Sequence, residues 1–303
     1  MRKLLGIGEC MVELSSAGEE GLMRLSFAGD VLNTLWYAQS DFAQSNKNWN
    51  AGFLSAVGED PMSEQMLNFL SDAKIDTTNI RRVPDRRPGL YMIHLDGAER
   101  SFSYWRDTSA ARLLAADIDH LSLAIECADT LYFSGITLAI LSKQDRNAML
   151  ACLKKAAEAG KLVAFDPNIR PALWSDDSEM REAITQAAAS ANLVLPSFDD
   201  EANNFGDTNP EATAQRYQDA GCDIVIVKNG AADVLVAEGK KRTTLDTPPV
   251  MEPVDTTGAG DSFNGAFLAN YVETMDLVEA TRAAQACSAK VICHYGALMP
   301  MPS

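Results

Sequence analysis

Asp255-Thr256-Thr257-Gly258-Ala259-Gly260-Asp261 runs directly into Ser262-Phe263-Asn264-Gly265-Ala266-Phe267-Leu268, a largely apolar stretch of helical character. The sequence therefore predicts a glycine-rich turn at the start of a helix. Glycines let the backbone approach a ligand closely, and the unpaired N–H groups and the helix dipole present partial positive charge there. We expect the amides of Gly258, Ala259 and Gly260 to form an anion-binding site.

Asp261 closes this turn and needs a different explanation. A carboxylate repels a phosphate, so its place beside an anion site favours contact with a nucleophile, whose proton it would accept as a general base. Aspartate also caps ordinary helix N-termini. From these residues alone, a catalytic and a structural role are equally acceptable.

Short apolar runs elsewhere predict buried strands. They cover residues 4–8, 52–57, 130–134, 162–166, 193–196 and 223–228. Alanine-rich stretches of helical character separate the later runs, at residues 143–160, 177–191 and 210–221. This alternation indicates an α/β fold with a doubly wound, mostly parallel sheet and helices on both faces.

Residues 84–108 break the alternation. Residues 88–106 read as a β-hairpin that turns at Asp96-Gly97 and stands off the main sheet. Because no linker or internal repeat interrupts the chain, we expect one domain over residues 1–303 with this β excursion.

A net charge of -16 opposes sequence-independent binding to nucleic acid or to anionic lipid. No apolar run reaches the roughly 18 residues of a membrane span. The N-terminus meets Glu9 and Glu13 before any apolar segment adequate for a signal peptide. We therefore expect a cytoplasmic protein with neither nucleic acid nor a membrane as partner.

Residues 255–268 resemble, over fourteen consecutive positions, the C-terminal signature of the ribokinase (PfkB) family of sugar and nucleoside kinases. The resemblance implies ATP and Mg²⁺ as cofactors, Asp261 as catalytic base, and Gly258, Ala259 and Gly260 as anion hole. It also implies a ribokinase-like three-layer α/β/α sandwich with a mostly parallel central sheet. A small β-sheet lid would come from roughly residues 10–28 and 84–108.

Further segments resemble the family in the expected order. Ala28-Gly29-Asp30-Val31-Leu32-Asn33 is similar to its Gly-Gly-x-x-x-Asn sugar motif, with Ala28 in place of the first glycine, which implies sugar contacts by Gly29, Asp30 and Asn33. Residues 55–60 resemble the segment that follows. Residues 225–232 resemble the strand and turn that meet the nucleotide, which implies ATP contacts by Lys228 and Gly230.

The metal motif departs from the family pattern. Leu195-Pro196-Ser197-Phe198-Asp199-Asp200-Glu201 occupies the place of an Asn-x-x-Glu motif whose acid holds Mg²⁺ through water. Ser197 replaces the asparagine and becomes the expected ATP contact. Either Asp200 or Glu201 can supply the acid, and the sequence leaves that choice open.

Residues 8–14, 104–106 and 165–170 resemble one branch of the family, whose members phosphorylate the sugar acid 2-keto-3-deoxygluconate. The resemblance implies that Tyr91, Tyr104 and Arg106 on the lid and Arg170 on the sheet side enclose the acid, and that Asn168 and Arg170 meet ATP. A guanidinium fits a planar carboxylate well. Pairing of the arginines with the protein's own acids, and packing of the tyrosines, are the structural alternatives.

The resulting hypothesis is transfer of the ATP γ-phosphoryl group to the 6-hydroxyl of 2-keto-3-deoxygluconate. The alternatives are a fructokinase or ribokinase-like sugar kinase and a non-catalytic sugar-acid binding protein. A nucleotide-dependent dehydrogenase is disfavoured because Met11 stands where the pattern begun by Gly6 and Gly8 needs a third glycine. Homo-oligomerisation through the lid, the epimer preference and a monovalent-cation requirement remain open.

Overall fold

A computed structural model describes residues 1–19, 21–45, 48–96 and 99–301. Its central sheet has the strand order β13-β12-β11-β10-β9-β8-β1-β4-β5. Neighbours from β5 to β11 pair in parallel, whereas β12 and β13 add antiparallel to one edge. The strands are β1 (Arg2–Ile7), β4 (Trp49–Val57), β5 (Ile80–Arg82), β8 (Thr130–Ser134), β9 (Leu162–Asp166), β10 (Leu193–Val194), β11 (Ile224–Val227), β12 (Val234–Glu238) and β13 (Lys241–Leu245).

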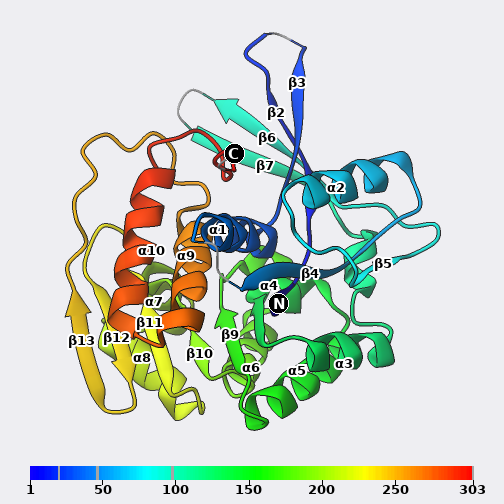
Figure 1. Cartoon of the computed structure of the whole chain (residues 1–303). Coiled ribbons are helices and arrows are strands. Elements are labelled where there is room, and N and C mark those ends of the chain that lie inside the picture. Colours follow the sequence, from blue (N-terminus) through cyan, green and yellow to red (C-terminus); the bar gives the residue numbers. More distant parts are fainter. Residues whose placement is uncertain (20, 46–47, 97–98, 302–303) are drawn as a thin grey trace.

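Helices cover both faces of this sheet, because its strands bury alternate side chains on opposite sides. Leu4 packs with one apolar cluster and Leu5 with the other. The first cluster includes side chains of α1 (Asp30–Gln44), α2 (Pro61–Asp72), α9 (Ala259–Thr274) and α10 (Leu277–Val291). The second includes α3 (Ile118–Cys127), α4 (Gly135–Ile140), α5 (Lys143–Glu158), α6 (Asp177–Ala188) and α8 (Pro210–Asp219), with α7 (Phe198–Phe205) packed against it. The predicted three-layer α/β/α sandwich is confirmed (Figure 1).

The expected helices begin where their capping residues predict. Ser142 and Asp176 accept the backbone N–H three residues ahead, at the starts of α5 and α6. Asn209 does the same for α8, whose first residue is Pro210. The three helices end two or three residues before the limits expected from the sequence.

A second, four-stranded sheet stands beside the sandwich at the top of Figure 1, in the order β3-β2-β6-β7. It consists of β2 (Met11–Ser16), β3 (Met23–Ala28), β6 (Leu90–Asp96) and β7 (Glu99–Trp105), so both segments expected to build it contribute. Strands β6 and β7 form the predicted hairpin. Gly97 of the predicted turn lies outside the described residues.

The chain reverses its direction of winding at β1. After β1, the chain adds β4 and then β5 on one side of β1. It then places β8 on the other side of β1. In open α/β sheets, ligands bind outside the carboxyl ends of the strands at such a point. Within the described part of the chain, no helix has the length and apolar character needed to cross a membrane.

Candidate active site

The predicted glycine turn lies at the start of α9. Gly258 has a φ of 77°, and a Cβ there would come within 2.8 Å of the Ala297 carbonyl oxygen, so the position requires glycine. The Ala259 amide donates to Thr256 O at 3.2 Å and is thus already engaged. Gly260 N–H, in the first helical turn, has no acceptor within the helix. Of the three amides expected to bind an anion, Gly260 N–H is therefore available to a ligand, whereas the Ala259 amide is already used within the turn.

Asp261 contacts the start of α1 through Asn33, whose Nδ2 donates to Asp261 Oδ2 at 2.7 Å. Burial and, next, the charge of Asp30 raise the pKa of Asp261 to about 7, against the lowering effect of the Asn33 hydrogen bond. A carboxyl with a pKa near neutrality is suited to accept a proton at physiological pH.

A cavity of about 350 Å³ brings most of the predicted reaction groups together. The predicted residues that line it are Asp30, Asn168, Arg170, Ser197, Asp200, Lys228, Gly258, Ala259, Gly260 and Asp261. Gly29 and Asn33 adjoin it, since the Gly29 amide lies 3.4 Å from Asn33 Oδ1 and Asn33 binds Asp261. Gly230 is exposed in the turn after β11 and does not line this cavity.

Asn168 links two carboxylates of this cavity. Its backbone N–H donates to Asp166 Oδ1 at 3.1 Å, and its Nδ2 donates to Asp30 Oδ2 at 3.0 Å. The residue has a φ of 33°, a backbone conformation that is costly for most side chains and is tolerated best by asparagine among them. The site thus holds Asn168 in place although its backbone is strained.

Lys228 lies buried at the end of β11, within a network that the sequence did not predict. Its Nζ donates to Asp166 Oδ2 at 3.3 Å and to Asn264 Oδ1 at 3.1 Å. Asn264 Nδ2 donates in turn to Asp166 Oδ2 at 2.6 Å and to Tyr132 OH at 3.1 Å. Two of the three ammonium protons are thereby used, and Lys228 also lines the cavity.

The structure separates the two candidate metal-binding acids. Glu201 is fully buried away from the cavity, where it accepts hydrogen bonds from Tyr217 OH at 2.9 Å and Arg216 Nη2 at 2.6 Å. Asp200 lines the cavity and lies 3.4 Å from Arg170 Nη1. Among the described residues no cluster of three or more His, Cys, Asp or Glu side chains is arranged to hold a metal. Asp200 is the acid that faces the site.

A larger cavity, of about 650 Å³, lies beneath the small sheet and shares Thr257 with the first. Glu13 and Arg24 supply charged groups to its wall. Glu13 accepts hydrogen bonds from Tyr91 OH and from Ser26 Oγ, the latter at 2.9 Å. The cavity adjoins the smaller one at Thr257, but none of the residues predicted to contact the sugar lines it.

The aromatic and basic residues expected on the lid differ in their surroundings. The Tyr91 and Tyr104 rings lie 5.9 Å apart, and Tyr104 is 54% exposed. Arg106 is buried in an ion pair with Glu9 and lines neither cavity. Arg170, in contrast, lines the smaller one.

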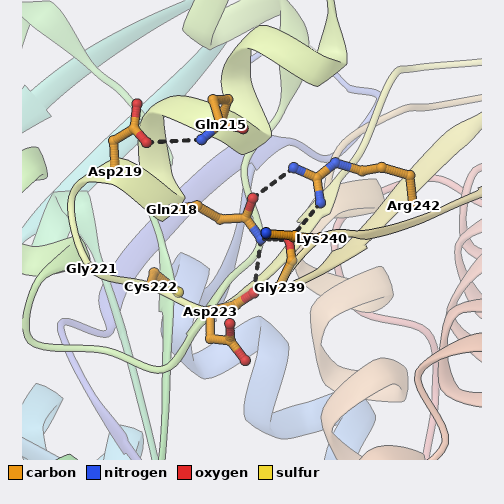
Figure 2. Close-up of a pocket in the computed structure, with 9 residues that line it drawn as sticks. All are labelled: Gln215, Gln218, Asp219, Gly221, Cys222, Asp223, Gly239, Lys240 and Arg242. Carbon is orange, nitrogen blue, oxygen red and sulfur yellow. Dashed lines mark hydrogen bonds between the residues drawn. The ribbon is translucent and has the colours of Figure 1, made fainter.

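A further hollow of about 550 Å³ lies at the amino end of β11, away from the groups described above (Figure 2). Gln218 crosses it, with Nε2 donating to Gly239 O at 2.8 Å and Oε1 accepting from Arg242 Nη2 at 2.7 Å. The polar groups that line the hollow thus largely form hydrogen bonds with one another. The hollow lies at the opposite edge of the sheet from Asp261.

Comparison with known proteins agrees with this geometry. The model of the pfkB family of carbohydrate kinases matches residues 1–303. A 2-dehydro-3-deoxygluconokinase of Haemophilus influenzae is 35% identical over 304 residues, covering 99% of this chain and 96% of the relative. The enzyme of the same name from Escherichia coli is 35% identical, with 99% and 97% covered. A fructokinase of Vibrio alginolyticus is 26% identical, with 100% and 97% covered.

Solved structures show the same fold. A PfkB protein from Polaromonas sp. JS666 superposes with a TM-score of 0.84 at 24% identity, covering 97% of this chain and 96% of that one. A putative ribokinase II from Escherichia coli, in complex with ATP and Mg²⁺, also gives a TM-score of 0.84, at 23% identity with 98% and 94% covered.

Proposed function

The chain belongs to the pfkB family of carbohydrate kinases, and on this premise we propose that it is a 2-dehydro-3-deoxygluconokinase, a phosphotransferase with an alcohol group as acceptor. It transfers the γ-phosphoryl group of ATP to the 6-hydroxyl of 2-keto-3-deoxygluconate. The observation that supports this most is full-length identity of 35% to two relatives of that name. The juxtaposed Asp261, Lys228 and Gly260 supply the chemistry.

Asp261 begins the reaction by accepting the proton of the acceptor's 6-hydroxyl. The oxygen forms a bond to the γ-phosphorus while the bond from that phosphorus to the β,γ-bridging oxygen breaks, and ADP leaves with the electron pair. The Asp261 carboxyl is held by Asn33 at 2.7 Å, which fixes its direction. The pKa of about 7 makes the carboxylate available at neutral pH without making it too weak a base.

Lys228 and the first turn of α9 neutralise the charge that develops on the phosphoryl group. Lys228 Nζ would lie 3.7 Å from a Cβ at Gly260, so the ammonium and the helix start face the same space. Asp166 and Asn264 hold the ammonium at a fixed point, and a preorganised charge needs little rearrangement in the transition state.

The residues present also suit Mg²⁺, which prefers carboxylate and water oxygens and is held by few protein groups together with substrate phosphates. Asp200 and Asp166 line the cavity with such oxygens, and Asp200 would hold the ion through water. When bound, the ion neutralises phosphate charge. Asn168, Arg170 and Ser197 complete the ATP side of the cavity.

The acceptor lies between the start of α1 and the small sheet. Gly29, Asp30 and Asn33 contact the acceptor from the start of α1. The small sheet covers the acceptor as a lid that excludes water, and this sheet carries Tyr91 and Tyr104. The lid sheet also presents exposed aromatic side chains, Phe102 and Trp105, through which a second copy can associate. We place the protein in the cytoplasm, as expected for a metabolic kinase of this family.

A fructokinase is the second candidate, because a fructokinase of 26% identity also matches over the full length. Initial rates of ADP release with Mg·ATP separate the two. We expect kcat/KM for 2-keto-3-deoxygluconate to exceed that for fructose and ribose by at least about 10²-fold, since a missing carboxylate leaves polar groups of the site unpaired. A preference for a neutral sugar rules out the acid, and binding of the acid without turnover indicates a non-catalytic protein.

The pH dependence of kcat/KM follows from the pKa of Asp261. Because the base must be ionised, and burial with the Asp30 charge raises its pKa to about 7, activity should fall roughly tenfold per pH unit below about pH 7 and level off above it. Initial rates between about pH 5.5 and pH 8.5 measure this profile. A flat profile over that range excludes Asp261 as the titrating base.

The magnesium requirement tests the choice between the two acids. Asp200→Asn should raise the Mg²⁺ concentration for half-maximal activity by about tenfold, because it removes a carboxylate at the cavity. Glu201→Gln is the matched control, since Glu201 pairs with Arg216 away from the cavity and its loss should lower stability only. The measurement is the activity of each variant as a function of free Mg²⁺ at a fixed ATP concentration. A higher Mg²⁺ requirement in Glu201→Gln, with none in Asp200→Asn, assigns the metal to Glu201.

A further inference from the structure

The segments that connect the small sheet to the sandwich are joined by one buried ion pair. Glu9 lies between β1 and β2, and Arg106 directly follows β7. Arg106 Nη2 donates to Glu9 Oε2, and the two side chains are only 9% and 2% exposed. The pair therefore connects the point where the chain enters the small sheet with the point where it leaves.

Two atoms of this pair lack partners. Glu9 Oε1 and Arg106 Nε are buried without a hydrogen bond to any described residue. Buried polar groups are nearly always hydrogen-bonded, and a purely structural ion pair is stable only when its remaining polar atoms are satisfied. Two unpartnered atoms on one buried pair, beside the turn at Gly29 that starts α1, therefore indicate a missing third group.

Close packing keeps the pair from rearranging alone. A Cβ at Gly89 would come within 2.8 Å of Glu9 Oε1 and 3.2 Å of Arg106 Cβ. A Cβ at Gly29 would overlap the Glu9 carbonyl oxygen, so Glu9 also adjoins the turn that starts α1. Glu9 thus contacts the small sheet and the sugar-binding turn at once, and these glycines leave room for it.

We propose that Glu9 is a positioning residue that holds the Arg106 guanidinium for the carboxylate of the acceptor. A guanidinium is planar and carries more N–H donors than one carboxylate can use, so fixing one edge on Glu9 orients the others. Arg106 Nε gains its missing partner when the acceptor's carboxylate binds. This inference rests on the proposed function and adds to it the residue that orients the acid-binding group.

Glu9→Gln tests the proposal, because glutamine keeps the size of the side chain and removes its charge. We expect KM for 2-keto-3-deoxygluconate to rise at least about tenfold, with kcat and KM for Mg·ATP within about threefold. The same sugar with an alcohol in place of the carboxylate should show an unchanged kcat/KM. Arg106→Lys keeps the charge but loses the planar fork, and it should give the same pattern, with no further loss in the double variant.

Glu64→Gln is the matched control, since it breaks an exposed Glu–Arg pair, with Arg82 at 2.6 Å, away from the site. It should leave all constants unchanged. The proposal is overturned if Glu9→Gln leaves KM for the acid unaltered or raises KM equally for the acid and the alcohol. If Glu9→Gln does not fold, the same result in Arg106→Lys overturns it. If the unmodified protein fails to phosphorylate the acid, the proposed function falls first and the inference with it.

Discussion

Asp261→Asn lowers kcat by at least about 10²-fold and leaves the affinity for the sugar acid within a few-fold. Asparagine keeps the shape of the side chain and the contact with Asn33, but it cannot accept the proton of the acceptor hydroxyl. The affinity for the sugar acid changes little, because other groups of the site supply most of the binding. Steady-state rates with Mg·ATP, together with calorimetric titration of the acid, measure both quantities.

The loss does not come from unfolding. The folded-state pKa of Asp261 is raised, so its contribution to stability is full below the unfolded value of the pKa and is lost as the pH rises through about 7. Above that pH the neutral variant should unfold at the same temperature as the unmodified protein or at a higher one. Asp72→Asn, at an exposed aspartate near the end of α2, is the control. A kcat within a few-fold of normal in Asp261→Asn removes Asp261 from the base role.

Lys228→Met lowers kcat/KM for Mg·ATP by about 10²-fold or more. The cavity also contains the carboxylates of Asp30, Asp166 and Asp200, so loss of the ammonium leaves phosphate facing an acidic surface. Methionine fills a similar volume, so the change acts mainly on charge. Initial rates over a range of Mg·ATP concentrations, with nucleotide titration, measure the effect.

Lys240→Met is the matched control, because Lys240 lines the distant hollow in Figure 2. It should leave the constants unchanged. Asp166 loses its ion pair in Lys228→Met, so thermal unfolding of the variant must be recorded beside its activity. A folded Lys228→Met protein whose kcat/KM lies within about threefold of normal contradicts the electrostatic role.

Much of the sandwich could be predicted because its strands and helices differ in local pattern. The strand at residues 162–166 is buried and therefore has a nearly continuous apolar sequence. The helix that follows Ser142 begins at a capping residue. The antiparallel edge strands β12 and β13 were not predicted. Their pairing depends on the partner strand that the fold supplies, and strand propensity is strongly context-dependent.

Residues of the smaller cavity were predicted where a compact motif contains them, as for Asp261 and Gly258–Gly260. The Glu9–Arg106 ion pair was not predicted, because the two residues lie 97 positions apart along the chain. Asp166 and Asn264 lay inside the matched segments, yet their contact with Lys228 spans 62 and 36 positions. Such contacts arise from topology, which a single sequence does not give.

The choice between Asp200 and Glu201 shows the same limit at short range. Neighbouring residues on a helix point about 100° apart, so the two side chains point in different directions. The sequence contains no signal for which one, because both are acidic. The structure buries Glu201 against Tyr217 and Arg216 and leaves Asp200 at the cavity.

The most direct measurement of the central claim is a ³¹P NMR spectrum of the products formed from Mg·ATP and 2-keto-3-deoxygluconate. The proposed function predicts one new phosphate monoester, coupled to the two protons at C6, formed in equal amount with ADP. Inorganic phosphate as the only product besides ADP, or no product with the acid while fructose is phosphorylated, would contradict it.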